Sequence, residues 1–345
     1  ESAMNMIGFL IAHEPTPMLY VLPTFDDAKK FSKLKLADMI RTTPALRTAV
    51  HDRRMPKGEK RSESTVLMKQ FAGGSLTLGG AANVARWLKG LCPGHNICLH
   101  GHAGYHGTGA SDLISLTRDA DVYLAPPLLR PHGHITTKER LYLTQPGMSP
   151  RTRQVLRIDD DTTMQVTAEE VDGLLSYLQM RAKREPAIQA VVVADYDKGV
   201  FTGPDGDVLI MRLGLFVQEH KLLCVVNSKR PKRWVEFPAA ALVCNTVEGQ
   251  ELNVFGRDEA ALAADCLIET DGPNGLTVYF QSGTTHFPSR ATTVVDVTGA
   301  GDAFLAGFTA ALLRDQSHRE AIEQGLAAAA HCCSQIGVGD PGMAE

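Results

Sequence analysis

The chain has 345 residues, of which 44% are hydrophobic and 21% charged, a composition typical of a globular protein. Its formal net charge of −4 gives no general attraction to nucleic acid or to a membrane surface. Its 7 cysteines are odd in number and include no C-x-x-C pair, which favours a reduced, cytoplasmic chain over a disulfide scaffold. No apolar stretch reaches the length of a membrane span.

The first part of the chain, residues 1–65, differs in composition from the rest. It is basic and interrupted by prolines, and its one plausible strand is Met18–Leu22. Between Asp26 and Arg61, lysine and arginine outnumber the acidic residues, which is typical of a solvated helical face; a surface for a phosphorylated or nucleic-acid partner is the alternative. No basic stretch precedes the short apolar run Met6–Ala12, so a secretory leader is not expected.

Apolar, β-branched runs alternate with amphipathic stretches through the rest of the chain. The runs that predict strands are Ala190–Ala194, Leu222–Asn227, Ala241–Asn245 and Leu276–Phe280. The stretches that predict helices are Ala81–Leu91, Ala168–Arg184, Glu259–Cys266 and Asp302–Arg314. Strands without polar alternation are covered on both faces, as in a parallel sheet. The sequence therefore predicts an α/β fold: a doubly wound, mostly parallel sheet flanked by helices.

Residues 134–160 interrupt this pattern. Polar and apolar residues alternate on both sides of Pro146-Gly147, which predicts an antiparallel hairpin with one solvated face. A hairpin that projects from a parallel sheet is suited to act as a small β lid.

The strongest chemical signal is the run VVDVTGAGDAFLAGF, which begins at Val294. An apolar stretch leads into Gly299-Ala300-Gly301, and a helix is predicted to begin at Asp302. The glycines allow a sharp turn, and the positive end of the following helix completes an anion hole. A carboxylate beside that hole can take the proton of a hydroxyl that attacks a bound γ-phosphate. The alternative is a helix that merely begins with a glycine turn and an acidic residue.

Other nucleotide-binding motifs are absent from the sequence. No G-x-x-x-x-G-K-[ST] segment occurs, which excludes a P-loop. Residues 299–304 read GAGDAF and lack the third glycine of the dinucleotide motif G-x-G-x-x-G.

Two segments together resemble the signatures of the PfkB, or ribokinase-like, carbohydrate kinases. Asp296–Asp302 (DVTGAGD) resembles the C-terminal signature, and Gly79–Ala85 (GGAANVA) resembles the N-terminal one. The resemblance implies a ribokinase-like core over residues 66–345, with ATP and Mg²⁺ as cofactors and a sugar as acceptor. It implies Asp302 as the base, with an anion hole at Gly299, Ala300 and Gly301. It also implies sugar contacts at Gly79, Gly80 and Asn83.

Three further segments narrow the resemblance to the D-glycero-D-manno-heptose 7-phosphate 1-kinases, the kinase half of the ADP-heptose synthesis enzymes. These segments are Thr136–Arg140, Gln154–Asp159 and Ala194–Gly199. The implied sugar-phosphate contacts are Lys138 and Arg140 in the lid, and Asp195 and Lys198 after a strand. Cations in a lid suit a sugar that already carries a phosphate. Solvated charges in the hairpin, and a turn cap at Asp195, are the alternatives.

The resemblance also implies residues on the nucleotide side. Asn245–Glu248 matches the family's N-x-x-E element, in which Glu248 helps to hold Mg²⁺ through water. An asparagine helix cap with glutamate at its third position is the alternative, and both can hold at once. The implied nucleotide contacts are Asn245, Lys229, Thr270, Gly272 and Gly275. Asp296 and Thr298 match positions that, in many members, help to bind a monovalent cation such as K⁺.

The sequence departs from the heptose kinases mainly on the sugar side. Their opening strand ends in Gly-Asp, and the nearest candidate here is Leu19–Phe25 followed by Asp26 and Asp27, with poor spacing. His100–Gly107 replaces the expected Gly-x-Asp-x-x-Gly, and its histidines favour hydrogen bonding over a zinc site. Asn227-Ser228-Lys229 stands in place of Asp-Pro-Lys.

The main hypothesis is an ATP-dependent sugar kinase, whose acceptor is a sugar phosphate that need not be the standard heptose. Two alternatives stay open: a kinase-fold binding or scaffold subunit with a lost sugar site, and a ribose or nucleoside kinase. A homodimer paired through the lid strands is expected, whereas membrane and nucleic acid are not expected as partners. A nucleotidyltransferase part is not expected, and adenylyl transfer is expected to need a partner protein.

Overall fold

The computed structural model of the chain describes residues 42, 50–51, 70–71, 78–101, 103–104, 108–125, 129–130, 136–143, 153–160, 163–184, 188–252 and 263–342. The chain divides into two units, Glu1–Leu76 with Thr137–Asp160, and Thr77–Thr136 with Asp161–Glu345. The predicted strand Met18–Leu22, the acids Asp26 and Asp27 and most of the basic segment lie outside the described residues.

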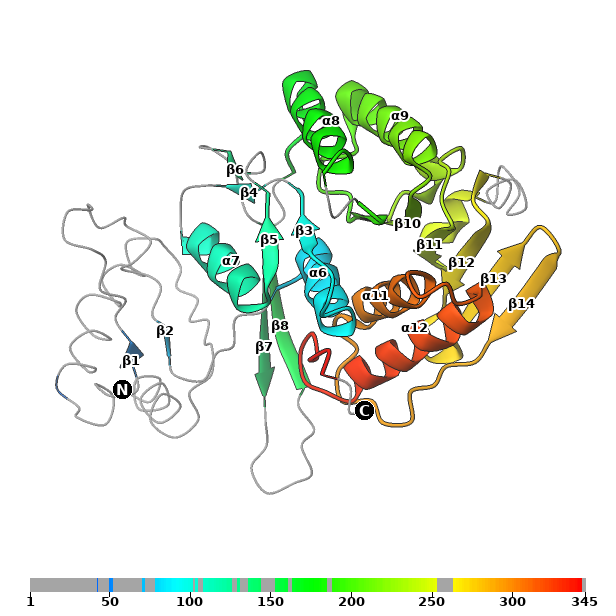
Figure 1. The fold of residues 1–345 in the computed structure, drawn as a ribbon. Helices are drawn as coiled ribbons and strands as arrows, with labels where there is room; N and C mark the ends of the chain where they lie inside the picture. Colours follow the sequence, from blue (N-terminus) through cyan, green and yellow to red (C-terminus); the bar gives the residue numbers. More distant parts are fainter. Residues whose placement is uncertain are drawn as a thin grey trace, which may run out of the picture. The chain divides into compact units, whose positions relative to one another are not determined.

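A six-stranded sheet in the order β14-β13-β12-β11-β10-β9 forms the centre of the larger unit (Figure 1). The parallel strands are β9 (Ala190–Asp195), β10 (Leu223–Ser228), β11 (Ala241–Asn245) and β12 (Cys266–Thr270). The antiparallel strands are β13 (Leu276–Phe280) and β14 (Gly283–Phe287). The structure thus confirms the predicted mixed α/β fold with a mostly parallel sheet.

The first and last residues of β11 and of β13 are those predicted from the sequence, but β12 was not predicted. Its prediction of a helix over Glu259–Cys266 was wrong at Cys266, where β12 begins. A short apolar run such as CLIET fits a buried strand and a buried helix equally well, and only its place between β11 and β13 decides.

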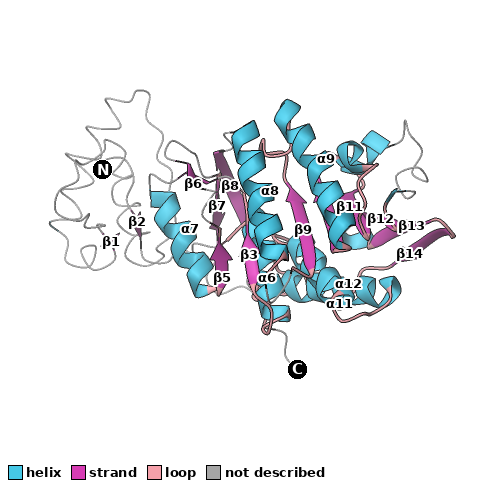
Figure 2. Ribbon diagram, turned by 45° about the horizontal axis from the view of Figure 1, so that its top comes forward, coloured by secondary structure: helices cyan, strands magenta, loops and turns pink. Residues whose placement is uncertain are grey.

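Helices cover both faces of this sheet (Figure 2). On one face lie α6 (Gly80–Leu91), α11 (Ala300–Leu312) and α12 (His318–Cys333). On the other face lie α8 (Ala168–Ala182) and α9 (Gly203–His220). The strands are apolar throughout because each face needs its own apolar side chains.

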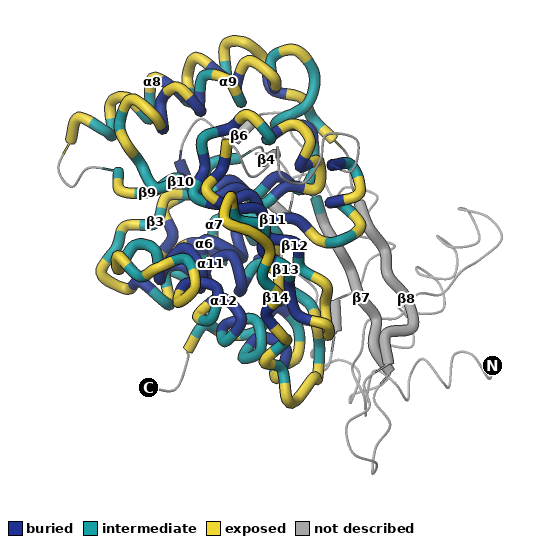
Figure 3. The backbone as a smooth tube through the Cα atoms, turned by 90° about the vertical axis from the view of Figure 1, so that its right-hand side faces the viewer, coloured by how far each residue is buried: buried dark blue, intermediate teal, exposed yellow. Residues whose placement is uncertain are grey.

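Neighbouring residues of one strand belong to different layers of the core. Val225 of β10 packs in the cluster that contains Trp87 and Phe304, whereas Val226 packs in the cluster that contains Phe216. The buried segments of β10, β11 and β12 lie between the helices in Figure 3. This two-sided core fixes the sheet and therefore the edge at which its strands end.

Shorter elements complete the larger unit. β3 (Ile97–Leu99) pairs parallel with β5 (Val122–Leu124), and β4 (Ala103–Gly104) pairs with β6 (Leu129–Arg130). α7 (Thr108–Asp119) lies between them in the chain. Three 3-10 turns follow strands of the main sheet: η3 (Pro231–Trp234), η4 (Glu248–Leu252) and η5 (Gly272–Asn274).

Two antiparallel pairs belong to the other unit, β1 (Val50–His51) with β2 (Gln70–Phe71) and β7 (Thr137–Leu143) with β8 (Arg153–Asp160). The β7–β8 pair confirms the predicted hairpin; its role as a lid stays a prediction. None of the helices within the described ranges combines the length and the apolar composition that a bilayer crossing requires.

Candidate active site

Polar residues gather where the parallel strands of the main sheet end. In the strand register, Ser228 of β10 stands beside Asp195 of β9, and Asn245 of β11 stands beside Thr270 of β12. The carboxyl ends of parallel strands form one edge, which is where sheets of this class place ligands. The sugar-side and nucleotide-side residues predicted separately from the sequence therefore share this edge.

A glycine turn precedes α11 at the same site. Gly299 has φ +82° and ψ 0°, the left-handed conformation that favours glycine. A Cβ at Gly299 would lie 3.0 Å from Nδ2 of Asn83 and 3.1 Å from Cα of Val338. A Cβ at Gly301 would meet nothing within 4 Å. The turn is therefore packed at its first glycine and open at its second.

The helix begins at Ala300, two residues before the predicted start, so Asp302 lies inside its first turn. The backbone N–H groups and the positive dipole end of α11 are thus next to Asp302. This is the arrangement that the sequence predicted for an anion hole.

Asp302 joins the two signatures, which are far apart in the chain. Its Oδ2 accepts a hydrogen bond of 2.7 Å from Nδ2 of Asn83, on α6. Its Oδ1 accepts a hydrogen bond from the hydroxyl of Tyr196, in the turn after β9. The structure therefore brings together the carboxylate of the C-terminal signature and the asparagine of the N-terminal signature.

Arg86 fixes the orientation of the Asn83 amide. It donates to Oδ1 of Asn83 from Nη2 at 2.9 Å and from Nε at 3.3 Å. It also donates to the carbonyls of Val338 and Gly339 in the C-terminal loop. Asn83 is fully buried. Because Oδ1 of Asn83 is held by a guanidinium, its NH₂ group must face Asp302.

Burial is the main electrostatic influence on this cluster. It raises the pKa of Asp302, against the hydrogen bonds from Tyr196 and Asn83 and the charge of Arg86, which lower it. Burial also raises the pKa of Tyr196 well above its usual value, and the Asp302 charge adds to this. Tyr196 thus stays protonated, and Asp302 holds a proton more strongly than an ordinary aspartate does. A general base needs this property.

Tyr196 and Arg86 were not predicted from the sequence as site residues. Nζ of Lys229 lies 5.8 Å from the centroid of the Tyr196 ring, and a Cβ at Gly80 would lie 3.5 Å from that ring. Two signals were available: Tyr196 directly follows the singled-out Asp195, and Arg86 lies three positions after Asn83, on the same helix face.

Asp195 lies beside the cluster, but its carboxylate is occupied. It is 5% exposed and accepts hydrogen bonds from Oγ of Ser228 at 2.7 Å, Nε1 of Trp234 at 3.1 Å and the Asp197 amide at 3.0 Å. The amide bond is the turn cap considered as the alternative to a sugar contact. These three donors favour a structural role for Asp195.

Replacing Asp195 with alanine is expected to lower the free energy of unfolding by about 3 kcal/mol, because three buried or half-buried donors lose their acceptor. Urea unfolding measures this difference. The control is Asp207→Ala, an exposed carboxylate that pairs with Arg233 at 3.2 Å and is expected to change stability by about 1 kcal/mol or less. If Asp195→Ala kept its stability but no longer bound the acceptor, Asp195 would be a sugar contact and not a structural residue.

The N-x-x-E element forms a cap at the end of β11. The side-chain Oδ1 of Asn245 accepts from the amides of Val247 at 2.9 Å and Glu248 at 2.8 Å. In return, Oε2 of Glu248 accepts from the Asn245 amide at 2.9 Å. The capping alternative is thus present, and it presents Glu248 at the sheet edge, close enough for its charge to raise the pKa of Tyr196.

The turn after β12 is built on two glycines with positive φ, +50° at Gly272 and +93° at Gly275. A Cβ at Gly275 would lie 2.1 Å from the carbonyl oxygen of Phe287, so this position requires glycine. Oγ1 of Thr270 donates to the carbonyl of Cys244 at 3.3 Å. The predicted nucleotide-side turn therefore follows the β12 residue that pairs with Asn245.

Asp296 ties the glycine turn to the C-terminal loop. Its Oδ1 accepts from the Thr298 amide at 2.9 Å, and its Oδ2 accepts from the Gly337 amide at 3.0 Å. Sγ of Cys332 donates to the Thr298 carbonyl at 3.4 Å. A monovalent cation at this loop would share carboxylate and carbonyl oxygens, the donor type that such ions prefer.

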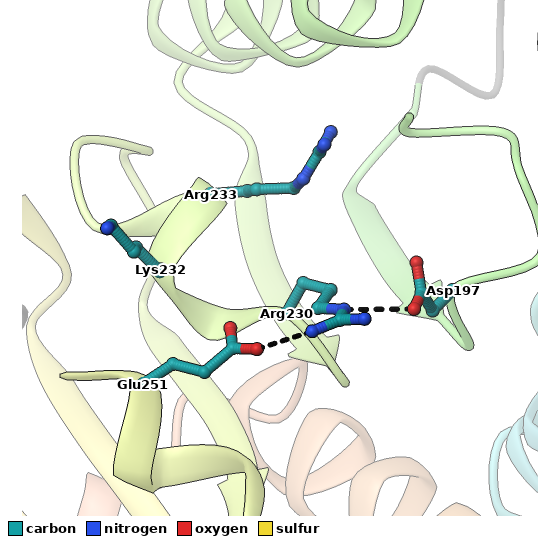
Figure 4. A pocket seen from close by; sticks show the side chains of 5 residues that line it. All are labelled: Asp197, Arg230, Lys232, Arg233 and Glu251. Atoms are coloured by element: carbon teal, nitrogen blue, oxygen red, sulfur yellow. Dashed lines mark hydrogen bonds and ion pairs between the residues drawn. The ribbon is translucent and has the colours of Figure 1, made fainter. Parts of the chain in front are cut away.

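A charged pocket of 660 Å³ lies between the turns that follow β9, β10 and β11 (Figure 4). Its lining residues are Asp197, Arg230, Lys232, Arg233 and Glu251. Arg230 bridges Asp197 through Nε at 2.9 Å and Glu251 through Nη1 at 2.7 Å. These residues were not predicted from the sequence as site residues. The two ion pairs of Arg230 connect the three turns.

The other cationic residues predicted for the site are Lys198, after β9, and Lys138 and Arg140, on β7. Lys198 is half-buried in the turn after β9. Lys138 and Arg140 lie on β7, and their side chains lie outside the described residues. The His100 ring packs on Tyr177 at 4.9 Å, and burial lowers its pKa to about 4. His102 and His106 lie outside the described residues.

Comparisons with known proteins support the reading of the C-terminal signature. The sequence model of the pfkB family of carbohydrate kinases matches residues 252–344, which include the glycine turn and Asp302. The bifunctional protein HldE of Hyphomonas neptunium is 28% identical over 285 residues, 77% of this chain and 53% of that protein. HldE of Helicobacter pylori is 27% identical over 296 residues, 81% of this chain and 60% of that protein.

The chain is similar to the PfkB carbohydrate kinases over residues 252–344. It spans only 53% and 60% of the length of these two HldE proteins.

Solved kinase structures share the fold of this chain. Phosphofructokinase-2 of Escherichia coli, in complex with potassium, aligns with a TM-score of 0.56 at 19% identity, over 83% of this chain and 88% of that one. Ribokinase of Thermotoga maritima aligns with a TM-score of 0.54 at 15% identity, over 79% and 86%. The fold is therefore that of the ribokinase family.

A second family model matches the other end of the chain. The model of the phage terminase large subunit gpA ATPase domain matches residues 1–90. This stretch contains the basic segment 1–65 and overlaps the signature Gly79–Ala85. The N-terminal segment that lacks the Gly-Asp element of the heptose kinases is therefore the segment that is similar to the terminase ATPase domain.

Proposed function

We propose that this chain is an ATP-dependent kinase that transfers the γ-phosphate to a sugar hydroxyl, with Asp302 as the catalytic base. The observation that carries the proposal is the 2.7 Å hydrogen bond between Asn83 and Asp302, because it joins the implied sugar segment to the implied phosphate segment. The match of residues 252–344 to the pfkB carbohydrate kinases supports the same function.

The chemistry follows from the position of Asp302 at the start of α11. Asp302 takes the proton of the acceptor hydroxyl while the hydroxyl oxygen attacks the γ-phosphorus and ADP leaves. The backbone N–H groups at Gly299–Gly301 and the helix dipole stabilise the negative charge on the transferred group. The open space at Gly301 leaves room for a phosphoryl group beside the base.

We assign the nucleotide to the edge formed by Lys229, Asn245, Thr270 and the turn Gly272–Gly275. Bound Mg²⁺ would neutralise phosphate charge there. Oε2 of Glu248 accepts the Asn245 amide, and the carboxylate keeps further lone pairs for a water of the Mg²⁺ shell. K⁺ is the ion that we expect at the Asp296–Thr298 loop.

We infer that the acceptor is a sugar phosphate, with D-glycero-D-manno-heptose 7-phosphate as the first candidate. The similarity to HldE proteins and the resemblance of the lid segment Thr136–Arg140 support this. Gly79, Gly80 and Asn83 are proposed to contact the sugar, and Lys138, Arg140 and Lys198 its phosphate. A cytoplasmic location and a homodimer formed through β7 and β8 stay predictions.

A binding or scaffold role is less favoured, because Asn83 and Asp302 are in place as a catalytic site requires. The ribokinase and phosphofructokinase structures share the fold, but at under 20% identity they do not identify the acceptor. The acceptor must therefore be found by experiment.

The full-length protein is tested with ATP and Mg²⁺ against the heptose 7-phosphate, fructose 6-phosphate, ribose and adenosine, with product mass as the readout. We expect kcat/KM for a sugar phosphate to exceed that for ribose and adenosine by about tenfold or more, since only it can pair with the cations. The absence of any phosphorylated product would reject the kinase assignment. Preference for adenosine would favour the nucleoside kinase.

A further inference from the structure

Both oxygens of the Asp302 carboxylate are engaged by side-chain donors, and these two donors differ in freedom. Asn83 is buried, and Arg86 holds its amide, so it is a fixed donor. Tyr196 instead offers a single hydroxyl, which reaches Oδ1 from the turn after β9. The Tyr196 hydroxyl donates one hydrogen bond to Oδ1 of Asp302. An acceptor sugar or a water molecule would place the same chemical group, a hydroxyl, at this oxygen.

The ring of Tyr196 is held between the two halves of the site. A Cβ at Gly80, in the implied sugar segment, would lie 3.5 Å from the ring, and Nζ of Lys229 lies 5.8 Å from its centroid. The neighbouring residues are anchored, because Asp195 accepts three hydrogen bonds and Asp197 pairs with Arg230. The backbone of this turn is thus fixed, and rotation of the side chain is the way for the hydroxyl to leave Asp302.

We propose that the Tyr196 hydroxyl occupies the catalytic base while no acceptor is bound, and so prevents water from acting as the phosphoryl acceptor. An acceptor that binds at Gly79 and Gly80 meets the ring and displaces the hydroxyl from Oδ1. This inference rests on the proposed kinase function, and it names Tyr196 as the residue that couples base access to acceptor binding.

The side reaction that Tyr196 suppresses is ATP hydrolysis. Without the phenol, a water molecule donates its hydrogen bond to Oδ1 of Asp302. Its oxygen forms a bond to the γ-phosphorus, the bond from that phosphorus to the bridging oxygen of ADP breaks, and the water proton passes to Asp302. The products are ADP and inorganic phosphate. The raised pKa of Tyr196 supports this role, because the phenol keeps the proton that it donates.

The test uses ATP and Mg²⁺ without any sugar, so it does not depend on the identity of the acceptor. Tyr196→Phe removes the hydroxyl and keeps the ring. We expect acceptor-independent phosphate release to rise about tenfold over the wild type, because access to the base no longer requires the breaking of one hydrogen bond. The double variant Tyr196→Phe with Asp302→Asn is expected to fall back to the wild-type level or below.

Tyr279→Phe is the matched control. Tyr279 also donates its hydroxyl to a carboxylate, Glu269, at 3.0 Å, but on β13 and β12, within the core of the sheet. Its loss is expected to leave ATP hydrolysis unchanged. Thermal unfolding and equilibrium ATP binding of both variants show that the fold and the nucleotide site are kept.

The outcomes separate this inference from the proposed function. Unchanged or reduced hydrolysis in a folded, ATP-binding Tyr196→Phe protein overturns it, even if the wild type phosphorylates a sugar. A rise that persists in the double variant also overturns it, since the hydrolysis would then not use Asp302. A rise that requires Asp302 supports it, even if every sugar tested with the wild type fails.

Discussion

Replacing Asp302 with asparagine is expected to lower kcat for sugar phosphorylation about 1,000-fold, because the site loses its general base. The amide keeps the size of the side chain and can still accept the hydrogen bond from Asn83 or from Tyr196 through its oxygen. ATP affinity is therefore expected to stay within about threefold of the wild type, since most of the proposed nucleotide contacts lie elsewhere on the edge. Steady-state kinetics and equilibrium nucleotide binding measure the two quantities.

The pH dependence of the wild type provides an internal check on Asp302. The carboxylate must be deprotonated to act as a base, so kcat/KM falls as the pH drops through its pKa. Burial raises that pKa, so the acid limb lies above the range of an exposed aspartate. The control is Asp207→Asn, an exposed carboxylate on α9 whose loss is expected to leave kcat unchanged. If Asp302→Asn kept activity within about tenfold of the wild type, another group would be the base.

Replacing Gly299 with alanine is expected to reduce both stability and activity. The left-handed backbone at φ +82° costs an alanine about 1–2 kcal/mol. The added Cβ also presses on Nδ2 of Asn83 at 3.0 Å and on Val338 at 3.1 Å. Because Asn83 holds Asp302, its displacement misplaces the base, and we expect kcat to fall about 100-fold. Urea unfolding and steady-state kinetics measure the two effects.

Gly301→Ala is the matched control for this turn. Its Cβ would point into open space, and alanine is favoured over glycine inside a helix, so we expect stability to be kept or raised by up to about 1 kcal/mol. If that open space receives the phosphoryl group, Gly301→Ala loses activity without losing stability. If Gly299→Ala and Gly301→Ala were equally stable, the close packing of Gly299 against Asn83 and Val338 would not be present.

Several features of the chain could be predicted from local sequence. β11 and β13 lie where their apolar runs predicted, since a short β-branched run between turn residues leaves few alternatives. The glycine turn before α11 was predicted because glycine and an acidic residue at a helix start have a local physical meaning. β12 was missed because its apolar run has no period that distinguishes a strand from a helix.

The sequence by itself determined the fold class, the glycine turn, the acidic first turn of α11 and the two signatures, because each depends on residues close together in the chain. Only the tertiary structure decided that Asn83 reaches Asp302, that Tyr196 donates to the other carboxylate oxygen, and that Asp195 accepts hydrogen bonds from three donors. These contacts join side chains that the sheet and its covering helices bring together from distant segments. A hydrogen bond depends on the positions of two atoms in space, and spacing along the sequence does not specify these for residues so far apart.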